Sequence, residues 1–249
     1  MKKDLKILVT YSNTPNCIES VIEHNGMNPA FDRKVYIPVL GSSATYTGKN
    51  NFFKSILHDD DGENISKFNQ SLNEYSVIYW AGKNYEKLDN PEYIGHCHYR
   101  RMLAVESEDD LDEHTIIVNQ FKLKTPISTQ LLAYHSPNVA EVFSAYTFKF
   151  ISTFPNEAND FVNWMSGDEF FACHMFIMHK SLFFKYSELM IKYINVLMPL
   201  VYQFPNIQDR STTFIPERLT SYVISKMLRE DPTLKAKQGK YIKLDGCKY

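Results

Sequence analysis

Short aliphatic runs alternate along this chain with longer segments of helical periodicity, and this alternation limits the possible folds more than any other feature. The extended runs lie at residues 5–10, 34–40, 93–101, 115–118 and 173–178. The helical segments lie at residues 71–84, 127–150, 181–198 and 216–227. Strands that alternate with helices are typical of α/β folds. We therefore predict a single α/β domain over residues 1–249.

The composition excludes several classes of protein. The 249 residues carry a formal net charge of -2 with a pI near 6.4, whereas a general nucleic-acid binder shows a basic excess. The four cysteines form no CxxC pair, which fits a reducing compartment. The first residues are typical of a strand rather than a signal peptide, and charged residues and Pro199 interrupt the apolar stretch 181–202. We expect a cytoplasmic protein with no nucleic-acid partner and at most peripheral membrane contact.

Local signals refine this outline. Pro38 places the second extended run at a sheet edge or a strand end, because proline cannot donate to a strand ladder. Ser71 and Glu74 match the S-x-x-E capping box, so we expect them to begin a helix. Pro216 suits the first turn of the last helix. The lysine-rich segment after Asp231 is expected to be a loosely ordered tail.

Histidine and arginine side chains gather at the end of the extended run 93–101. In His96-x-His98-x-Arg100, period-two geometry turns all three side chains to one face if the strand extends that far. Arg100 and Arg101 could bind a diphosphate, since guanidinium groups bind phosphate oxygens bidentately. The competing structural interpretation pairs these two arginines with nearby carboxylates.

A metal site at His96 and His98 is a further alternative. It needs a third ligand, and the sequence offers only the distant residues His135, His174 and Asp168. We therefore do not favour a zinc site there.

The run of three aspartates at residues 59–61 suggests a different metal site. Asp59 and Asp61 have the Asp-x-Asp spacing that in many sugar transferases holds a divalent ion against a diphosphate. Three aspartates before a glycine are more often a solvated turn. Metal binding by Asp59 and Asp61 therefore stays open.

Two carboxylates are candidates for a general base. Glu217, in Pro216-Glu217-Arg218, could take the proton of an acceptor hydroxyl, although the helix dipole alone also favours a first-turn glutamate. Asp168, which precedes the extended run 173–178, is the second candidate. Glu217 is the first choice.

A set of segments spread over most of the chain forms a recognisable pattern. In chain order they are Asp61–Ser66, Asn69 with Glu74, Tyr79–Ala81, Lys83-Asn84, Tyr93–Gly95, Cys97-His98-Tyr99-Arg100-Arg101, Met175–Met178 and Glu217-Arg218-Leu219. Together they resemble a bacterial family of capsular and exopolysaccharide synthesis proteins, of the domain-of-unknown-function type, that are regarded as glycosyltransferases. The CHYRR block at 97–101 is the most specific segment. The resemblance implies a GT-A-like nucleotide-sugar-binding fold with a Rossmann-like central mixed sheet flanked by helices.

The resemblance also implies a reaction. It is the transfer of a hexose from a nucleotide sugar, with a UDP-linked galactose or galactofuranose expected, to a saccharide acceptor that is commonly lipid-linked at the inner face of the membrane. Residues 1–120 would then mainly bind the nucleotide sugar, 121–230 would carry the acceptor side and the base, and 231–249 would be a tail. The resemblance fixes no cofactor, and dependence on Mn2+ or Mg2+ stays open.

As a hypothesis, we assign residues to these roles. Those expected to bind the nucleotide and its diphosphate are Tyr11, Asp61, Asn64, Ser66, His98, Arg100 and Arg101. His174 and Arg218 are placed on the acceptor side. This chain has His174 where the family tends to have asparagine, and Gly82 where it tends to have tryptophan. These two departures leave the choice of donor and acceptor open.

Two other classes of function compete with transfer. Aromatic residues make up 14% of the chain and the metal motif is weak, which also suits a non-catalytic saccharide-binding or scaffolding protein. That protein would bind glycan without nucleotide. A metal-dependent hydrolase built on His96 and His98 would instead require a tightly bound metal ion.

Overall fold

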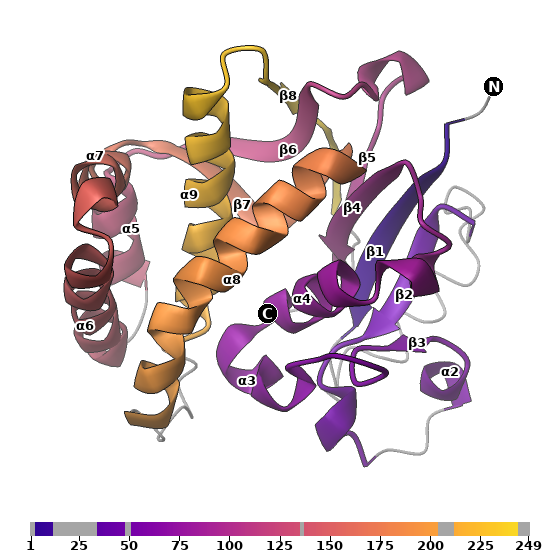
Figure 1. The fold of residues 1–249 in the computed structure, drawn as a ribbon, viewed down its shortest axis with the longest axis horizontal. Helices are drawn as coiled ribbons and strands as arrows, with labels where there is room; N and C mark the ends of the chain where they lie inside the picture. Colours follow the sequence, from indigo (N-terminus) through magenta and orange to yellow (C-terminus); the bar gives the residue numbers. More distant parts are fainter. Residues whose placement is uncertain (1–2, 12–33, 48–50, 135–136, 204–211, 244–249) are drawn as a thin grey trace.

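One mixed sheet forms the centre of the molecule (Figure 1). The computed structural model describes residues 3–11, 34–47, 51–134, 137–203 and 212–243, and His135 lies outside these ranges. Within them, nine strands pair in the order β3-β2-β1-β4-β7-β6-β8, with β5 beside β4 and β9 beside β5. The strands are β1 (Leu5–Tyr11), β2 (Tyr36–Leu40), β3 (Leu57–His58), β4 (Tyr93–His98), β5 (Arg101–Ala104), β6 (Thr115–Lys122), β7 (Glu169–His179), β8 (Lys235–Gln238) and β9 (Lys240–Lys243). The predicted α/β class with a mixed central sheet is confirmed.

The longer helices form two groups, one packed against the sheet and the other packed against the first group (Figure 1). They are α2 (Asn51–Lys54), α3 (Asn69–Leu72), α4 (Tyr75–Lys83), α5 (Ile127–Tyr134), α6 (Pro137–Thr153), α7 (Ala158–Ser166), α8 (Lys180–Gln203) and α9 (Phe214–Glu230). Helices α4, α8 and α9 cover one face of the sheet, and α5, α6 and α7 lie beside α8 and α9. Among the helices of the described ranges, none is both long and apolar enough to cross a membrane.

Strand direction determines where polar strand ends meet. β1 is parallel to both β2 and β4, and β7 is antiparallel to β4 and β6. Thr10 of β1 pairs with His98 of β4, so the carboxyl ends of these two strands lie side by side. In an open α/β sheet this edge is where ligands bind.

The core explains why β1 has an almost continuous apolar sequence. Ile7 and Val9 belong to the hydrophobic cluster on one face of the sheet, whereas Leu8 belongs to the cluster on the helix-covered face. A strand that is buried on both faces needs apolar side chains in both directions. Gly95 of β4 is also required, since a Cβ there would lie 2.8 Å from the Phe176 carbonyl oxygen of β7.

The predicted capping box is wrong. Ser71 lies inside α3, and Asn73, with φ 53°, separates α3 from α4. Glu74 is the N-cap residue of α4 but makes no capping hydrogen bond with its side chain. Its carboxylate instead contacts His98 of β4, so a tertiary contact replaces the local one.

The prediction of a loosely ordered tail after Asp231 is also wrong for the residues up to 243. β8 pairs in parallel with β6, and β9 pairs antiparallel with β5. Pro38 lies inside β2 and pairs with Val9 of β1, but β3 pairs only with Val39 and Leu40, so Pro38 has no partner residue on β3. Helix α9 begins two residues before Pro216, near the predicted start.

Candidate functional site

A bulge in β7 lies at the polar edge of the sheet. Residues 172–175 of β7 lie opposite the single residue Asn119 of β6, where the register between the two strands shifts. Cys173 and His174 have φ 67° and 51°, a left-handed conformation that costs a residue with a Cβ about 1–2 kcal/mol. Two such residues in a row persist only where the surrounding structure holds them, and such strain is concentrated at functional sites.

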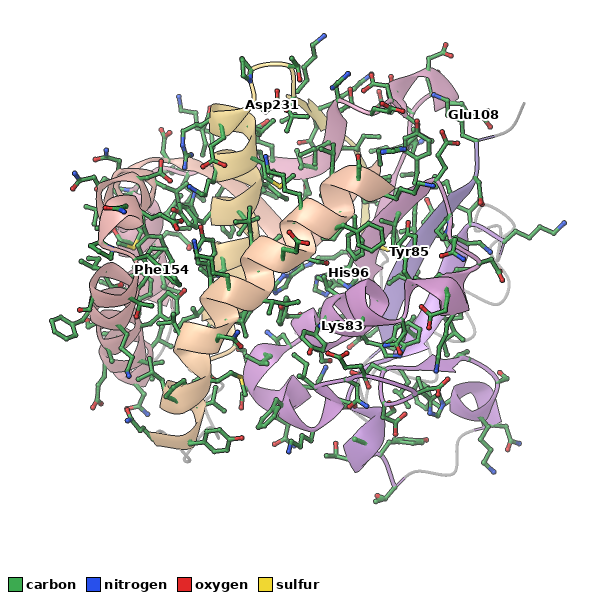
Figure 2. All side chains as sticks on the ribbon, viewed as in Figure 1. Lys83, Tyr85, His96, Glu108, Phe154 and Asp231 are labelled. Carbon is green, nitrogen blue, oxygen red and sulfur yellow. The ribbon has the colours of Figure 1, made fainter. Side chains whose placement is uncertain are left out.

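Two histidines of β4 hold the carbonyl groups of this bulge. His96 Nδ1 donates to the His174 carbonyl oxygen over 2.7 Å, and His98 Nε2 donates to the Cys173 carbonyl oxygen. Burial lowers the pKa of His96 to about 3, so the ring is neutral. Its Nε2 therefore accepts the hydrogen bond of the Thr10 hydroxyl, 2.8 Å away. Figure 2 shows His96 near the centre of the molecule.

His98 has a different protonation state. Its Nε2 faces a carbonyl oxygen and its Nδ1 lies 2.9 Å from Glu74 Oε1, so both ring nitrogens face acceptors and both carry a proton. Burial lowers the pKa of His98, but the Glu74 charge and hydrogen bonds outweigh burial and raise it overall. Burial would raise the pKa of Glu74, and the charge and hydrogen bond of His98 reverse this and hold it well below its usual range. Glu74 and His98 therefore form an ion pair.

Glu217, in the first turn of α9, contacts the same bulge from the other side. Its Oε1 accepts the Cys173 N–H over 2.8 Å, and its Oε2 accepts from Arg218 Nη1 over 2.9 Å. Burial raises the pKa of Glu217, but Arg218, His174 and the Cys173 N–H together lower it. Glu217 is therefore an ionised carboxylate at the strand-end edge, with 20% of its side chain exposed.

Arg218 is fixed in place by three neighbours. Its Nη1 donates to Glu217, its Nη2 donates to Gln130 Oε1 over 2.5 Å, and its guanidinium lies 4.9 Å from the ring centre of Phe170. The side chain is almost fully buried. Arg218 therefore stabilises the charge of Glu217 rather than facing solvent.

His174 extends the buried network towards α8 and α9. Its Nδ1 lies 2.7 Å from the Thr220 hydroxyl, which in turn lies 2.8 Å from the Tyr186 hydroxyl. Burial lowers the pKa of His174 to about 4, so the ring is neutral. Its Nε2 is buried and has no hydrogen-bond partner in the described part of the chain.

Arg100 does not continue the strand. β4 ends at His98, which pairs with Arg101 of β5 across a two-residue turn of Tyr99 and Arg100. The expectation that His96, His98 and Arg100 share one strand face therefore fails at Arg100. The Arg100 guanidinium lies 5.2 Å from the Tyr99 ring centre, and Tyr99 stacks on Tyr11 at 5.6 Å.

Arg101 brings a guanidinium group to the bulge. Its Nη1 lies 2.9 Å from Cys173 Sγ. Burial raises the pKa of the Cys173 thiol to about 12, so the thiol stays protonated and is a poor nucleophile. Cys173 therefore contributes to the site through its backbone N–H and carbonyl group. Arg101 contributes a positive charge.

Asp59 is a structural residue rather than part of a solvated turn. Its side chain is fully buried. Its two oxygens accept from the N–H groups of Ser42 and Ser43 and from the hydroxyls of Ser43, Ser66 and Ser76. These five hydrogen bonds satisfy both carboxylate oxygens. They connect Asp59 to three other segments of the chain, at residues 42–43, 66 and 76.

The rest of the loop at 61–66 is held by contacts of its own. Asp61 pairs with Lys87 at 2.6 Å. Asn64 donates to the Gly62 carbonyl oxygen and accepts from the Ser66 N–H. These contacts hold Asp61, Asn64 and Ser66 in the loop. None of them is a contact with Glu217.

The candidate metal ligands do not form a metal site. No group of three His, Cys, Asp or Glu side chains is arranged to hold a metal ion in the described ranges. Asp59 is occupied by five donors, Asp61 by a lysine, and both ring nitrogens of His96 and of His98 by hydrogen-bond partners. The ligand atoms of Asp59, His96 and His98 are therefore already used in other contacts, and dependence on Mn2+ or Mg2+ stays a prediction.

Asp168, the second candidate base, lies away from the bulge. It pairs with Lys122 at 3.8 Å and is 47% exposed. Four residues lie between it and Cys173, so five steps along the strand separate the two, about 16 Å at the rise of a strand. The structure brings together Glu217, His98, Arg101 and His174 but leaves out Asp168.

Three residues of this site were not singled out for chemistry. Glu74 matched the family pattern but was assigned to a helix cap, and Cys173 and Thr220 carried no signal. A positive φ at Cys173 has no marker in the sequence because the residue is not glycine. The signal that could have found Glu74 is its presence among the matching segments.

The fold and the site together define a class of protein. A mixed α/β sheet carries buried ion pairs and cationic side chains at the carboxyl edge of its parallel strands, which is the ligand-binding edge of such folds. Residues 20–227 match the sequence pattern of DUF4422, a domain of unknown function, and the chain belongs to this family. No curated protein matches the chain.

Solved structures support the fold. The apo structure of WbbM, a bifunctional glycosyltransferase, has a TM-score of 0.71 and 18% identity, and the match covers 98% of this chain and 46% of that chain. The chain thus spans less than half the length of WbbM, and the likeness shows a shared GT-A-like fold. The mannosyltransferase Ktr4p from S. cerevisiae has a TM-score of 0.40 and 11% identity, with 96% of this chain and 70% of that chain covered. That second likeness is too weak to carry an argument.

Proposed function

We propose that this protein is a glycosyltransferase that moves a sugar from a nucleotide-sugar donor to a saccharide acceptor. The observation that carries the proposal is the ionised Glu217 carboxylate, fixed at the strand-end edge by the Cys173 N–H and Arg218. The fold shared with WbbM supports it.

The proposed reaction needs a base. The acceptor hydroxyl loses a proton as its oxygen bonds to the anomeric carbon of the donor sugar, and a fixed carboxylate can accept that proton. Glu217 is ionised and partly exposed, and its lone pairs are only partly used by its two donors. We assign the base to Glu217.

The reaction also needs cations. When the bond between the sugar and the diphosphate breaks, the nucleoside diphosphate leaves with additional negative charge. Arg100 and Arg101 follow directly on the end of β4, and guanidinium groups can bind phosphate oxygens bidentately. Both ring nitrogens of His98 already have partners, so we assign the diphosphate to the two arginines. Tyr11, which stacks on Tyr99 beside them, would border the nucleotide.

The finer assignment rests on the family resemblance. We propose a UDP-linked donor, with galactose or galactofuranose as the sugar, and a lipid-linked saccharide acceptor in the synthesis of a bacterial surface polysaccharide. The enzyme would then work in the cytoplasm, at the inner face of the membrane. His174 and Arg218 are buried, so any influence on the acceptor would pass through Glu217.

A thermal-shift screen tests donor binding. The purified protein is heated with UDP, GDP, CMP and their sugar conjugates, with and without manganese, because a ligand that binds only the native state raises the unfolding temperature. We expect a selective shift with one nucleotide that Arg100→Ala abolishes. A shift with glycans and none with nucleotides would support the non-catalytic saccharide-binding alternative instead.

Glu217→Gln tests the base. Gln keeps the size of the side chain but cannot accept the proton, so kcat is expected to fall at least about 100-fold while the Kd for the nucleotide changes little. Asp168→Asn is the matched control, since it neutralises the exposed carboxylate away from the bulge. A Glu217→Gln enzyme with wild-type turnover would remove this role.

A further inference from the structure

The backbone of Cys173 links two carboxylates that lie on different elements. Its N–H donates to Glu217 of α9, and its carbonyl oxygen accepts from His98 of β4. His98 in turn pairs with Glu74 at the start of α4. Glu74, His98, Cys173 and Glu217 therefore form one continuous chain of contacts.

His98 is placed to act through this peptide rather than on a ligand. Its side chain is 11% exposed, and its two N–H groups already have acceptors in Glu74 and Cys173. A phosphate oxygen would find no N–H group of this ring to accept from. His98 fixes the peptide plane that follows the Cys173 Cα, and Glu217 holds the N–H of the plane that precedes it. The two planes meet at this Cα, so together the two contacts restrain the φ and ψ angles of Cys173.

Glu74 determines that the ring keeps both protons. Without its carboxylate, Nδ1 would face no acceptor, and a buried ring would favour the neutral form with a single N–H. The Cys173 carbonyl would then depend on a ring that can carry its single proton on either nitrogen and is free to rotate. The left-handed backbone at Cys173, with φ 67°, would lose one of its restraints.

We propose that Glu74 and His98 are positioning residues, which hold the backbone of Cys173 in its left-handed conformation and thereby fix the Glu217 carboxylate for its reaction. The catalytic part of this proposal rests on the proposed function. The structural part, the link from Glu74 to the Cys173 N–H, stands without it.

A double-mutant cycle tests the catalytic part. Glu74→Ala is expected to lower kcat about 10- to 100-fold with little change in nucleotide Kd, since a small displacement of a reacting group costs up to about 100-fold. In a Glu217→Gln background, Glu74→Ala is expected to cause little further loss, because it acts only through Glu217. Equal losses in both backgrounds, or an unchanged kcat, would overturn the proposal.

Glu157 supplies the matched control. Like Glu74 it is a largely buried carboxylate, with 17% of its side chain exposed, and it contacts Lys192 and Tyr193 away from the bulge. Glu157→Ala is expected to lower stability while the folded enzyme keeps its kcat. If Glu74→Ala fails to fold, Glu74→Gln serves instead, since its amide oxygen can still accept from Nδ1 but carries no charge.

A structural measurement separates this proposal from the proposed function. Crystal structures of wild-type and Glu74→Ala protein report the φ angle of Cys173 and the distance from Cys173 N to Glu217 Oε1, 2.8 Å here. We expect that contact to break or lengthen in the variant. If the contact survives in both Glu74→Ala and His98→Phe, the positioning role is refuted, whatever the enzyme transfers. If it breaks but the wild-type protein transfers no sugar, only the proposed function fails.

Discussion

His174 and His98 show how one residue type takes two charge states within one buried network. His98 faces two acceptors, one of them a carboxylate, and is charged. His174 faces the Thr220 hydroxyl on one side and has no partner among the described residues on the other, and burial lowers its pKa to about 4. The two rings therefore respond to pH with opposite signs.

Proton linkage determines how the stability contributed by His174 changes with pH. Its pKa is about 4 in the folded chain and has its ordinary value of 6.5 in the unfolded chain, so the unfolded chain binds more protons between these values. Stability is expected to fall as the pH drops through this window, by about 2 kcal/mol between pH 7 and 5 for this residue. His96, with a pKa of about 3, acts in the same direction. His98 contributes stability below pH 6.5 that is lost as the pH rises through its raised folded value.

His174→Asn tests this linkage. The amide can still bond the Thr220 hydroxyl but does not titrate, so the loss of stability between pH 7 and 5 is expected to shrink by about 2 kcal/mol. Urea unfolding of the wild-type and variant proteins at both pH values measures it. An unchanged pH slope would show that His174 is not the neutral buried group described here.

Asp59 shows why the role of a single residue is hard to predict from sequence. The Asp-x-Asp spacing and the following glycine indicated either a metal ligand or a solvated turn. The structure instead buries the carboxylate among serine donors that come from residues 42–76. Donors that far apart in sequence become visible only once the fold has brought their segments together.

At the scale of elements, the β7 bulge makes a prediction of its own. Cys173 has φ 67°, a conformation that glycine adopts readily and β-branched residues strongly resist. Cys173→Gly is expected to leave stability within about 1 kcal/mol of wild type, whereas Cys173→Val is expected to cost about 2 kcal/mol or more. Urea unfolding of the two variants provides the comparison. Equal stability would mean that the left-handed backbone is not needed there.

The elements themselves were largely predictable, but their irregular points were not. Aliphatic runs gave β1, β6 and β7, because burial on both faces needs apolar side chains. The β7 bulge was missed because histidine donors on β4, rather than a glycine in β7, hold it. The capping box predicted at Ser71 and Glu74 is wrong because the ion pair with His98 overrides a local signal.

At the scale of the whole molecule, the site is assembled from distant parts of the chain. Glu74, His98, Cys173 and Glu217 come from α4, β4, β7 and α9, which only the sheet topology brings together. The sequence indicated His98 and Glu217 separately, and the family resemblance added Glu74 to the pattern. Their contacts through the Cys173 peptide could not be predicted, since no periodicity reports a backbone bulge.

The C-terminal strands make the last prediction, which concerns the stability of the whole fold. β8 covers the edge of β6, β9 pairs with β5, and Gly239 between them packs so closely that a Cβ would lie 2.6 Å from Leu103 and 2.7 Å from Ile117. A chain that ends at Leu234 would expose the edge of β6 and is expected to unfold at lower urea and to aggregate.

Gly239→Val is the matched single substitution, because its Cβ would overpack both neighbours at a cost of about 1–3 kcal/mol while the pairing strands stay in the chain. Urea unfolding and light scattering of both proteins measure the effect. If the shortened chain keeps wild-type stability and solubility, residues 235–249 are a dispensable tail after all. If only the shortened chain is impaired, strand pairing matters more to the fold than the packing at Gly239.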